Sequence, residues 1–187
     1  MGTVADLARC PWCGTDPLYV DYHDNEWGRP EHDAKRLFEL LILESFQAGL
    51  SWITILRKRE GFRAAFRGFD PKIIATWGEA EVTRLLADPG IVRHRGKIEG
   101  TIRGAQAYLQ IEADRGFSPF LWSFVGGAPL QRQPKTMAEV PGQTPESQAM
   151  SKALKRERFN FVGPTITYAF MQASGMVNDH LVNCPHR

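Results

Sequence analysis

One carboxylate, Glu44, falls on the apolar side of a predicted helix. The preceding residues 37–43 read Leu-Phe-Glu-Leu-Leu-Ile-Leu, and in a helix Glu44 continues their apolar stripe toward Ala48. A carboxylate on a core-facing stripe costs several kcal/mol unless a partner or a ligand meets it. Gly49 ends this helix and Trp52 opens the next. An acid, a glycine turn and a large ring so close together predict a ligand pocket; the alternative is a helix end whose glutamate reaches solvent.

Aromatic residues gather in a segment that precedes this helix. Residues 9–30 contain Trp12, Tyr19, Tyr22 and Trp27 among prolines and glycines, with no aliphatic helical stripe, so we expect an irregular segment that lies against the helices. Aromatic faces around one acid could hold a flat, electron-poor ring with an N–H donor. An adenine methylated on its ring fits, because it is cationic while attached to the sugar and its amino group donates to a carboxylate. Guanine presents an acceptor there. Core packing is the alternative for any single ring.

Soft metal ligands are divided between the two ends of the chain. They are Cys10, Cys13 and His23 near one end and His180, Cys184 and His186 near the other. The spacing of His180 and Cys184 corresponds to one helical turn. A tetrahedral zinc held by two cysteines and two histidines would join the ends, and without an open position it would be structural. The odd number of cysteines favours a metal in a reducing compartment over a disulfide; the alternative is a buried free thiol with surface histidines.

Residues 88–98 predict a tight, basic turn between two helices. Gly90 begins the turn and Gly96 lies near the start of the second helix. The basic residues around it are Arg93, His94, Arg95 and Lys97. Amides at a helix N-terminus bind phosphate, so the pattern is typical of a helix-hairpin-helix, which grips the DNA backbone without reading sequence. A solvated surface is the alternative, and it is the interpretation we favour for a second basic stretch, residues 152–158.

Helical patterns follow one another along the chain and strand-like alternation is nearly absent. The predicted segments are 32–48, 51–58, 62–69, 79–87, 95–113, 118–125, 144–158 and 163–175, with a helix start at Asp70-Pro71 and a capping box at Thr136 and Glu139. The expected fold class is therefore all-α. We expect residues 1–187 to form a single globular unit in which the terminal segments, about 1–30 and 176–187, make a zinc-tied subregion.

Composition limits the choice of partners and location. The formal net charge of +2 is too small for a generally polyanion-binding surface, so any nucleic-acid contact must be a local patch. The first eight residues lack a basic head and an apolar run, and no stretch approaches membrane-spanning length. We therefore expect a cytoplasmic protein without a membrane partner.

Four stretches resemble the constitutive bacterial family of 3-methyladenine DNA glycosylase I. They are DPLYVDYHDNEWG at 16–28, QAGLSWI at 47–53, GIVRHRGK at 90–97 and VNDH at 177–180. The similarity runs from about Cys10 to Cys184. It implies a helix-hairpin-helix glycosylase fold whose terminal segments are tied by a structural zinc.

The resemblance also implies roles for individual residues. The zinc ligands would be Cys10, His23, His180 and Cys184, although Cys13 and His186 depart from the pattern and could compete. The base pocket would fall on Glu44, Tyr22, Trp52 and Trp12, with Trp27 close by. The turn that enters the duplex would contain Gln47, Gly49 and Leu50. The hairpin residues on the DNA backbone would be Gly90, Arg93, Arg95, Gly96 and Lys97. The family lacks its superfamily's catalytic aspartate, and we assign no role to Asp114.

The expected activity is hydrolysis of the N-glycosidic bond of 3-methyladenine, with 3-methylguanine as a further candidate, in alkylated duplex DNA. Base flipping would deliver the base to a monomeric enzyme. Glu44 and Tyr22 would be the catalytic residues: Glu44 selects the base and stabilises positive charge on the sugar, and Tyr22 bonds the base edge. The alternatives are a zinc-stapled DNA-binding module without catalysis and a hydrolase of free nucleosides.

Overall fold

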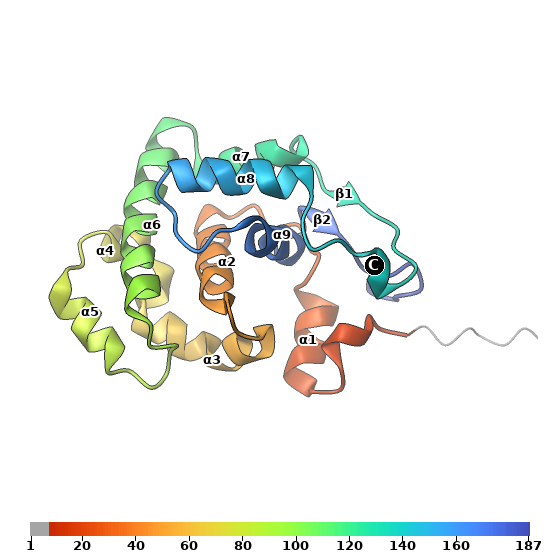
Figure 1. The fold of residues 1–187 in the computed structure, drawn as a ribbon, viewed down its shortest axis with the longest axis horizontal. Coiled ribbons are helices and arrows are strands. Elements are labelled where there is room, and N and C mark those ends of the chain that lie inside the picture. The colour runs from red at the N-terminus through yellow and green to blue at the C-terminus, as the bar shows by residue number, and fades with distance from the viewer. Residues whose placement is uncertain (1–7) are drawn as a thin grey trace, which may run out of the picture.

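The computed structural model describes residues 8–187 and is almost entirely helical (Figure 1). The helices are α1 (Pro17–Asn25), α2 (Ala34–Gln47), α3 (Trp52–Ala65), α4 (Pro71–Ile74), α5 (Glu79–Leu86), α6 (Arg95–Asp114), α7 (Phe117–Trp122), α8 (Pro145–Arg156) and α9 (Pro164–Ala173). Single 3-10 turns cover Pro11–Cys13, Arg67–Phe69, Ser123–Val125 and Met137–Glu139. The prediction of an all-α fold is confirmed. Residues 1–7 of the predicted zinc-tied segment lie outside the described residues.

Helix α2 lies at the centre and packs against α3, α6 and α9 (Figure 1). Its stripe of Leu37, Leu41 and Phe46 is fully buried because neighbours cover it on several sides. Asp33 starts the helix by accepting a hydrogen bond from the Arg36 amide. Among residues 8–187 the strands are a two-residue parallel pair, β1 (Leu130–Gln131) and β2 (Val177–Asn178). Every helix in this range is too short or too polar to cross a bilayer.

The prediction that residues 9–30 are irregular is wrong over α1. Asp16 caps this helix by accepting from the Leu18 amide, and Pro17 occupies its first position. The residues that α1 buries are Tyr22 and His23 rather than aliphatic side chains. Its inner face meets a pocket and a ligand cluster instead of the aliphatic core, so the usual apolar stripe is missing from the sequence.

Helix α3 is continuous where two helical segments, 51–58 and 62–69, were expected. Gly61 lies inside it, and a Cβ at that position would collide with the Gly90 carbonyl oxygen. Glycine is therefore needed for close approach of the hairpin and not as a helix break. The predicted capping box at Thr136 and Glu139 is also wrong, because only a 3-10 turn forms there and the threonine side chain makes no cap.

Helices α5 and α6 form the expected helical hairpin. Lys97 of α6 links this hairpin to the C-terminal end of α2 by hydrogen bonds. Lys97 is buried, and its ammonium donates to the carbonyls of Phe46 at 2.8 Å and Ala48 at 2.6 Å. Carbonyls at a helix C-terminus lack intrahelical partners and carry partial negative charge, so they attract a cation. Burial lowers the pKa of Lys97. This placement contradicts the prediction that Lys97 holds a DNA phosphate.

Replacing Lys97 with methionine should destabilise the fold. The variant loses two charge-assisted hydrogen bonds and leaves carbonyls without partners, so we expect the free energy of unfolding to fall by about 3 kcal/mol in urea titrations. Arg93→Gln, an exposed change in the same hairpin, should stay within about 0.5 kcal/mol of the parent protein. A Lys97 variant as stable as the Arg93 variant would contradict the structural role.

Candidate active site and metal centre

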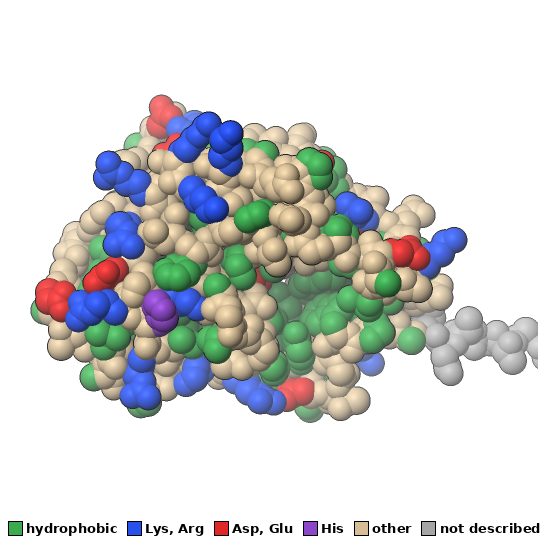
Figure 2. Space-filling view, viewed as in Figure 1, with side chains coloured by type: hydrophobic (Ala, Val, Ile, Leu, Met, Phe, Trp, Pro, Cys, Tyr) green, Lys and Arg blue, Asp and Glu red, His purple; other side chains and the backbone are tan. Residues whose placement is uncertain are grey.

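A cavity of about 280 Å³ opens between α1, α2, α3 and α9. Figure 2 shows it as a hollow lined largely by apolar side chains. Six residues predicted from the sequence line it: Trp12, Tyr22, Trp27, Glu44, Gln47 and Trp52. The cavity is large enough for a purine base, and its walls are aromatic on several sides.

Glu44 lies in this cavity and is 3% exposed. Burial raises the pKa of its carboxyl group to about 8, so its neutral form predominates at pH 7. Its Oε2 atom has no hydrogen-bond partner. The alternative interpretation of a helix end reaching solvent is therefore excluded, and the carboxyl group is available to a ligand.

Unpartnered polar atoms are concentrated in the cavity wall. In the described part of the chain, buried side-chain atoms without a hydrogen bond are Glu44 Oε2, Gln47 Oε1, Trp52 Nε1 and Asp179 Oδ1, and all four residues line the cavity. Asp179 Oδ1 lies 3.5 Å from Arg132 Nε, an ion pair without a hydrogen bond. Buried polar groups are rarely left unpaired in native proteins. The Glu44 carboxyl group, the Gln47 amide oxygen and the Trp52 N–H are therefore available to a polar ligand.

The aromatic residues of the wall pack mostly edge to face or tilted. Tyr22 and Trp52 have ring centroids 5.4 Å apart, and Trp12 meets Trp27 at 4.8 Å and Tyr19 at 5.2 Å. These contacts hold the rings without a ligand. Burial, and then the nearby Glu44, raises the pKa of Tyr22 well above its ordinary value. Its hydroxyl therefore keeps its proton and can donate.

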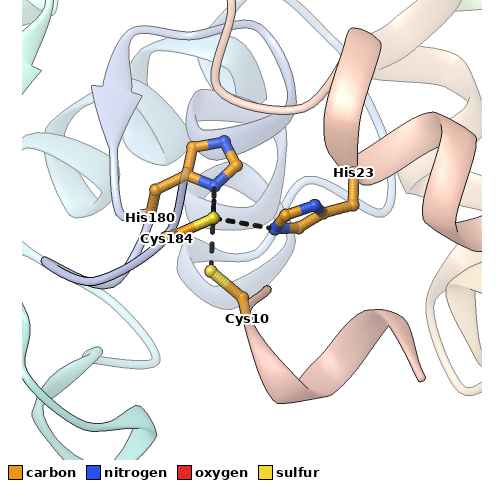
Figure 3. Close-up of side chains that lie close together, drawn as sticks. All are labelled: Cys10, His23, His180 and Cys184. Atoms are coloured by element: carbon orange, nitrogen blue, oxygen red, sulfur yellow. Dashed lines mark hydrogen bonds between the residues drawn. The ribbon is translucent and has the colours of Figure 1, made fainter. Parts of the chain in front are cut away.

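Four ligand side chains from the two ends of the chain converge behind this wall (Figure 3). They are Cys10, His23, His180 and Cys184; each offers one atom, and these atoms lie within 4.8 Å of one another. All four residues are buried. Cys10 precedes the first 3-10 turn, His23 is on α1, and the other two follow β2. Two thiols and two imidazoles at this spacing could hold a metal ion.

The surroundings of the cluster also fit a metal. His23 donates from Nδ1 to Asp24 at 2.7 Å, and His180 donates from Nε2 to the Trp27 carbonyl at 3.1 Å, which leaves the other nitrogens for a ligand. Burial lowers the pKa of His180 to about 4 and raises that of Cys10 to about 12. The imidazoles are therefore neutral, and a bound cation would provide the charge that a buried thiolate needs. Cys13 lies outside this group.

The comparisons with known proteins agree with this geometry. The sequence pattern of the methyladenine glycosylase family matches residues 12–187. The chain belongs to this family. It is 55% identical over 179 residues to DNA-3-methyladenine glycosylase 1 of Escherichia coli (strain K12), covering 95% of this chain and 96% of that protein.

Solved structures extend the agreement to the fold. A crystal structure of 3-methyladenine DNA glycosylase I matches with a TM-score of 0.94 and 53% identity, over 95% of this chain and 98% of that one. A structure of the Staphylococcus aureus enzyme, which concerns its recognition of 3-methyladenine, matches with a TM-score of 0.92 and 42% identity over 95% of each chain. The predicted family and glycosylase fold are confirmed.

In this methyladenine glycosylase the turn between α2 and α3 projects from the cavity rim. Gly49 has a left-handed φ of 82°, which favours glycine, and Leu50 is 44% exposed. Gln47 instead faces the cavity. Of the three residues predicted to enter the duplex, Gly49 and Leu50 therefore lie at an exposed tip, whereas Gln47 lies in the wall of the cavity.

The predicted hairpin residues have fewer free groups than expected. The Gly90 amide donates to Asp88 at 2.7 Å and is not available to a phosphate. Arg95 is paired with Glu79 and Glu99. Gly96 lies against the His94 ring at the start of α6. Arg93 is exposed, and in residues 8–187 no carboxylate lies within ion-pair distance of it.

Sequence reasoning missed several cavity residues. Asp179 is 1% exposed and accepts hydrogen bonds from Tyr168 at 2.5 Å and Gln172 at 2.9 Å. Tyr19, Met137, residues 140–142 and one side of α9 also line the wall. The aspartate stands in the VNDH stretch that carries the family resemblance, and this was the signal that could have found it. Nothing in the local pattern indicates that Met137 and residues 140–142 reach the cavity.

Replacing Glu44 with glutamine should remove a pH dependence of stability. The folded pKa of about 8 lies above the ordinary 4.5, so the folded protein keeps a proton that the unfolded chain releases. Stability of the parent protein therefore falls as pH rises between these values. At about pH 4 we expect Glu44→Gln and the parent protein to have nearly the same free energy of unfolding. By about pH 8 the free energy of unfolding of the variant should be higher than that of the parent by a few kcal/mol.

Urea titrations at several pH values measure this difference. Both proteins have the same Cys/His cluster, so any effect of acid pH on that cluster largely cancels between them. An advantage that does not change with pH would contradict the burial of an unpaired carboxyl group at position 44.

Proposed function

We propose that this methyladenine glycosylase hydrolyses the N-glycosidic bond of 3-methyladenine in alkylated duplex DNA. The observation that carries the proposal is the buried carboxyl group of Glu44, with one free oxygen, in a ring-lined cavity. The relatives named above are DNA-3-methyladenine glycosylases. We propose duplex DNA with an alkylated adenine as the partner.

The unpartnered atoms of the cavity suit this base. The amino group of adenine donates, and Glu44 Oε2 and Gln47 Oε1 are free acceptors. The ring nitrogens of adenine accept, and Trp52 Nε1 and the Tyr22 hydroxyl are donors. The faces of Trp12 and Trp52 would contact the cationic ring, with Trp27 behind them, and attract it through their π-electrons.

The charge of the base explains how little acid–base chemistry is required. Methylation at N3 makes the base cationic, so it leaves with the bonding electron pair as neutral 3-methyladenine while water attacks the sugar carbon and loses a proton. Arrival of the cation favours the ionised form of Glu44, which burial alone disfavours. The carboxylate then stabilises positive charge on the sugar without becoming a nucleophile.

The exposed turn between α2 and α3, at Gly49 and Leu50, would take part in flipping the base out of the duplex. Extruding a base costs a few kcal/mol, least for a damaged one. Leu50, with Gly49 allowing the backbone to approach, would fill the gap that the base leaves and offset this cost. Gln47 would connect the filled gap with the cavity.

We propose zinc as the metal of the four-ligand cluster. Two cysteines and two histidines fill the four positions of a tetrahedral site, which is the structural type of zinc site. The metal would tie residues about 1–30 and 176–187 together, so that residues 1–187 act as a single unit. We expect a monomer. The buried free cysteines suit a reducing compartment, and we propose the cytoplasm.

The test of the activity is the base released from methylated duplex DNA, separated by chromatography. Glu44→Ala should lower the rate of 3-methyladenine release roughly 100-fold and weaken binding of the free base in parallel. Asp114→Asn is the control, since that side chain is 69% exposed and lies on the surface at the end of α6. Duplex binding without base release would indicate a DNA-binding module, and hydrolysis of free nucleosides without duplex affinity would indicate the other alternative.

The same assay addresses lesion range. 3-Methylguanine presents a carbonyl acceptor where adenine has its amino group, and only protonated Glu44 can donate to it. We therefore expect slower release of 3-methylguanine than of 3-methyladenine, and the ratio of the two rates should fall as pH rises and Glu44 loses its proton. A ratio independent of pH would contradict this role of the protonated acid.

The test of the metal is its content and its effect on stability. Purified protein should contain about one zinc per chain, and a chelator should lower the melting temperature by roughly 10 °C or more. Cys184→Ser should lose the zinc, whereas Cys13→Ser, which changes a neighbouring thiol outside the cluster, should retain it. Equal zinc content in both variants would contradict the proposed ligand set.

A further inference from the structure

Two carboxyl groups line the base cavity: Glu44 of α2 and Asp179, which follows β2. The function proposed above uses only Glu44. Asp179 is 1% exposed, and within residues 8–187 no lysine or arginine lines the cavity beside it. Burial of a carboxylate opposes folding unless neighbouring groups stabilise the charge. The surroundings of Asp179 therefore indicate what a second acid does in this cavity.

The pairing of β1 with β2 fixes the position of Asp179. The two strands are parallel, with Gln131 opposite Asn178. The next residues, Arg132 and Asp179, lie beside each other, and the Arg132 amide donates to the Asn178 carbonyl at 3.2 Å. On the other side of Asp179, the His180 amide donates to Asn178 Oδ1 at 3.2 Å. The carboxyl group therefore enters the cavity from a backbone that is hydrogen-bonded on both sides.

Two side chains of α9 hold the Asp179 carboxyl group. Its Oδ2 atom accepts hydrogen bonds from the Tyr168 hydroxyl at 2.5 Å and from the Gln172 amide at 2.9 Å. Burial, and then the contact with Asp179, raise the pKa of Tyr168 above its ordinary value, so the hydroxyl keeps its proton and donates. Hydrogen bonds donated to a carboxylate stabilise its ionised form. Asp179 is therefore held as a charged group, and its Oδ1 atom makes no hydrogen bond.

The ion pair with Arg132 leaves the charge of Asp179 open to the cavity. Arg132 Nε lies 3.5 Å from Asp179 Oδ1, and the arginine side chain is 42% exposed whereas that of the aspartate is fully buried. Arg132 does not line the cavity. Water around an exposed cation screens its field, whereas a buried anion acts through a medium of lower dielectric constant. A ligand in the cavity therefore experiences the carboxylate more strongly than the guanidinium group.

Glu44 and Asp179 differ in charge because their surroundings differ. Burial raises the pKa of Glu44 to about 8, so Glu44 is mostly neutral at pH 7, and its Oε2 atom has no hydrogen-bond partner. Asp179 has two hydrogen-bond donors and a neighbouring cation. The negative charge of the cavity wall at pH 7 therefore comes mainly from Asp179.

We propose that Asp179 is a specificity-determining residue of the base cavity, whose buried carboxylate attracts the positive charge of an alkylated base. The inference rests on the proposed function and deepens it. Asp179 acts through space on the charge of the base, whereas Glu44 would contact the base edge and ionise when the base arrives. An undamaged base is neutral and gains nothing from Asp179, so this residue increases the preference for the cationic lesion.

The test is Asp179→Asn in the full-length protein, which keeps the size of the side chain and one oxygen for Tyr168 and Gln172 but removes the charge. Release of 3-methyladenine from alkylated duplex in a single turnover, at enzyme concentrations below saturation, should slow roughly tenfold or more. Binding of free 3-methyladenine should stay within about twofold of the parent value, because the released base is neutral. Equal losses in both measurements would overturn the proposal, since a damaged cavity wall would then explain them. An unchanged release rate would overturn it as well.

A second variant, Arg132→Gln, should change the release rate in the opposite direction and tests the proposal even if Asp179→Asn does not fold. It removes the cation beside the carboxylate at an exposed position, so release of 3-methyladenine should be as fast as in the parent protein or roughly twofold faster. Slower release would overturn the proposal, because the cavity would then require the ion pair and not the negative charge.

The matched control is Asp114→Asn, the same chemical change at a side chain that is 69% exposed. This variant should release 3-methyladenine at the parent rate. A loss equal to that of Asp179→Asn would overturn the proposal, since the effect would then not depend on the cavity. Base release by the parent protein tests the glycosylase activity by itself, so a failure of the Asp179 inference is distinguishable from a failure of that function.

Discussion

The candidate site is organised around a carboxyl group held in an apolar cavity, whose Oε2 atom has no hydrogen-bond partner. Glu44 continues the buried stripe of α2, the most central helix, so its position is set by packing along the whole helix. Its burial is unfavourable for the ionised form, and a cationic ligand in the cavity would offset this cost. Burial of this carboxyl group lowers the stability of the fold. In return, the site can distinguish a charged ligand from a neutral one. A neutral, undamaged base offers no comparable compensation, which gives a physical reason for selectivity toward an alkylated one.

The wall around this acid is held by the ends of the chain rather than by the aliphatic core. Trp12 and Trp27 pack on each other, and their other faces meet the histidines of the four-ligand cluster at 5.1 Å for His23 and 4.7 Å for His180. The cluster and the cavity therefore share their aromatic residues. A segment with few aliphatic side chains cannot bury enough surface to hold such rings alone, and a metal ion in the cluster would supply the missing constraint.

Positive charge near the hairpin has two different uses. Lys97 points inward and ties α6 to the end of α2, so it controls where the Gly49 turn projects. Its ammonium group is hydrogen-bonded to carbonyls at the end of α2, so it is not available to bind a phosphate. The free cations lie beside it, around the turn after α8. These cations are a local concentration of positive charge on a protein whose net charge is only +2.

Local sequence determined the helices with strong aliphatic periodicity, the acid on the apolar face of α2, and the residue types of the ligand cluster. It failed for α1, whose inner face is aromatic and polar, and for Gly61, which resembles a helix break but serves a close contact. Only the tertiary structure decided that Asp179, Met137 and residues 140–142 reach the cavity, that Lys97 turns inward, and that Arg103 meets Lys155 and Arg158 in one hollow. Periodicity reports which face of an element is buried, whereas charge partners and cavity walls depend on contacts between distant segments, which no local pattern encodes.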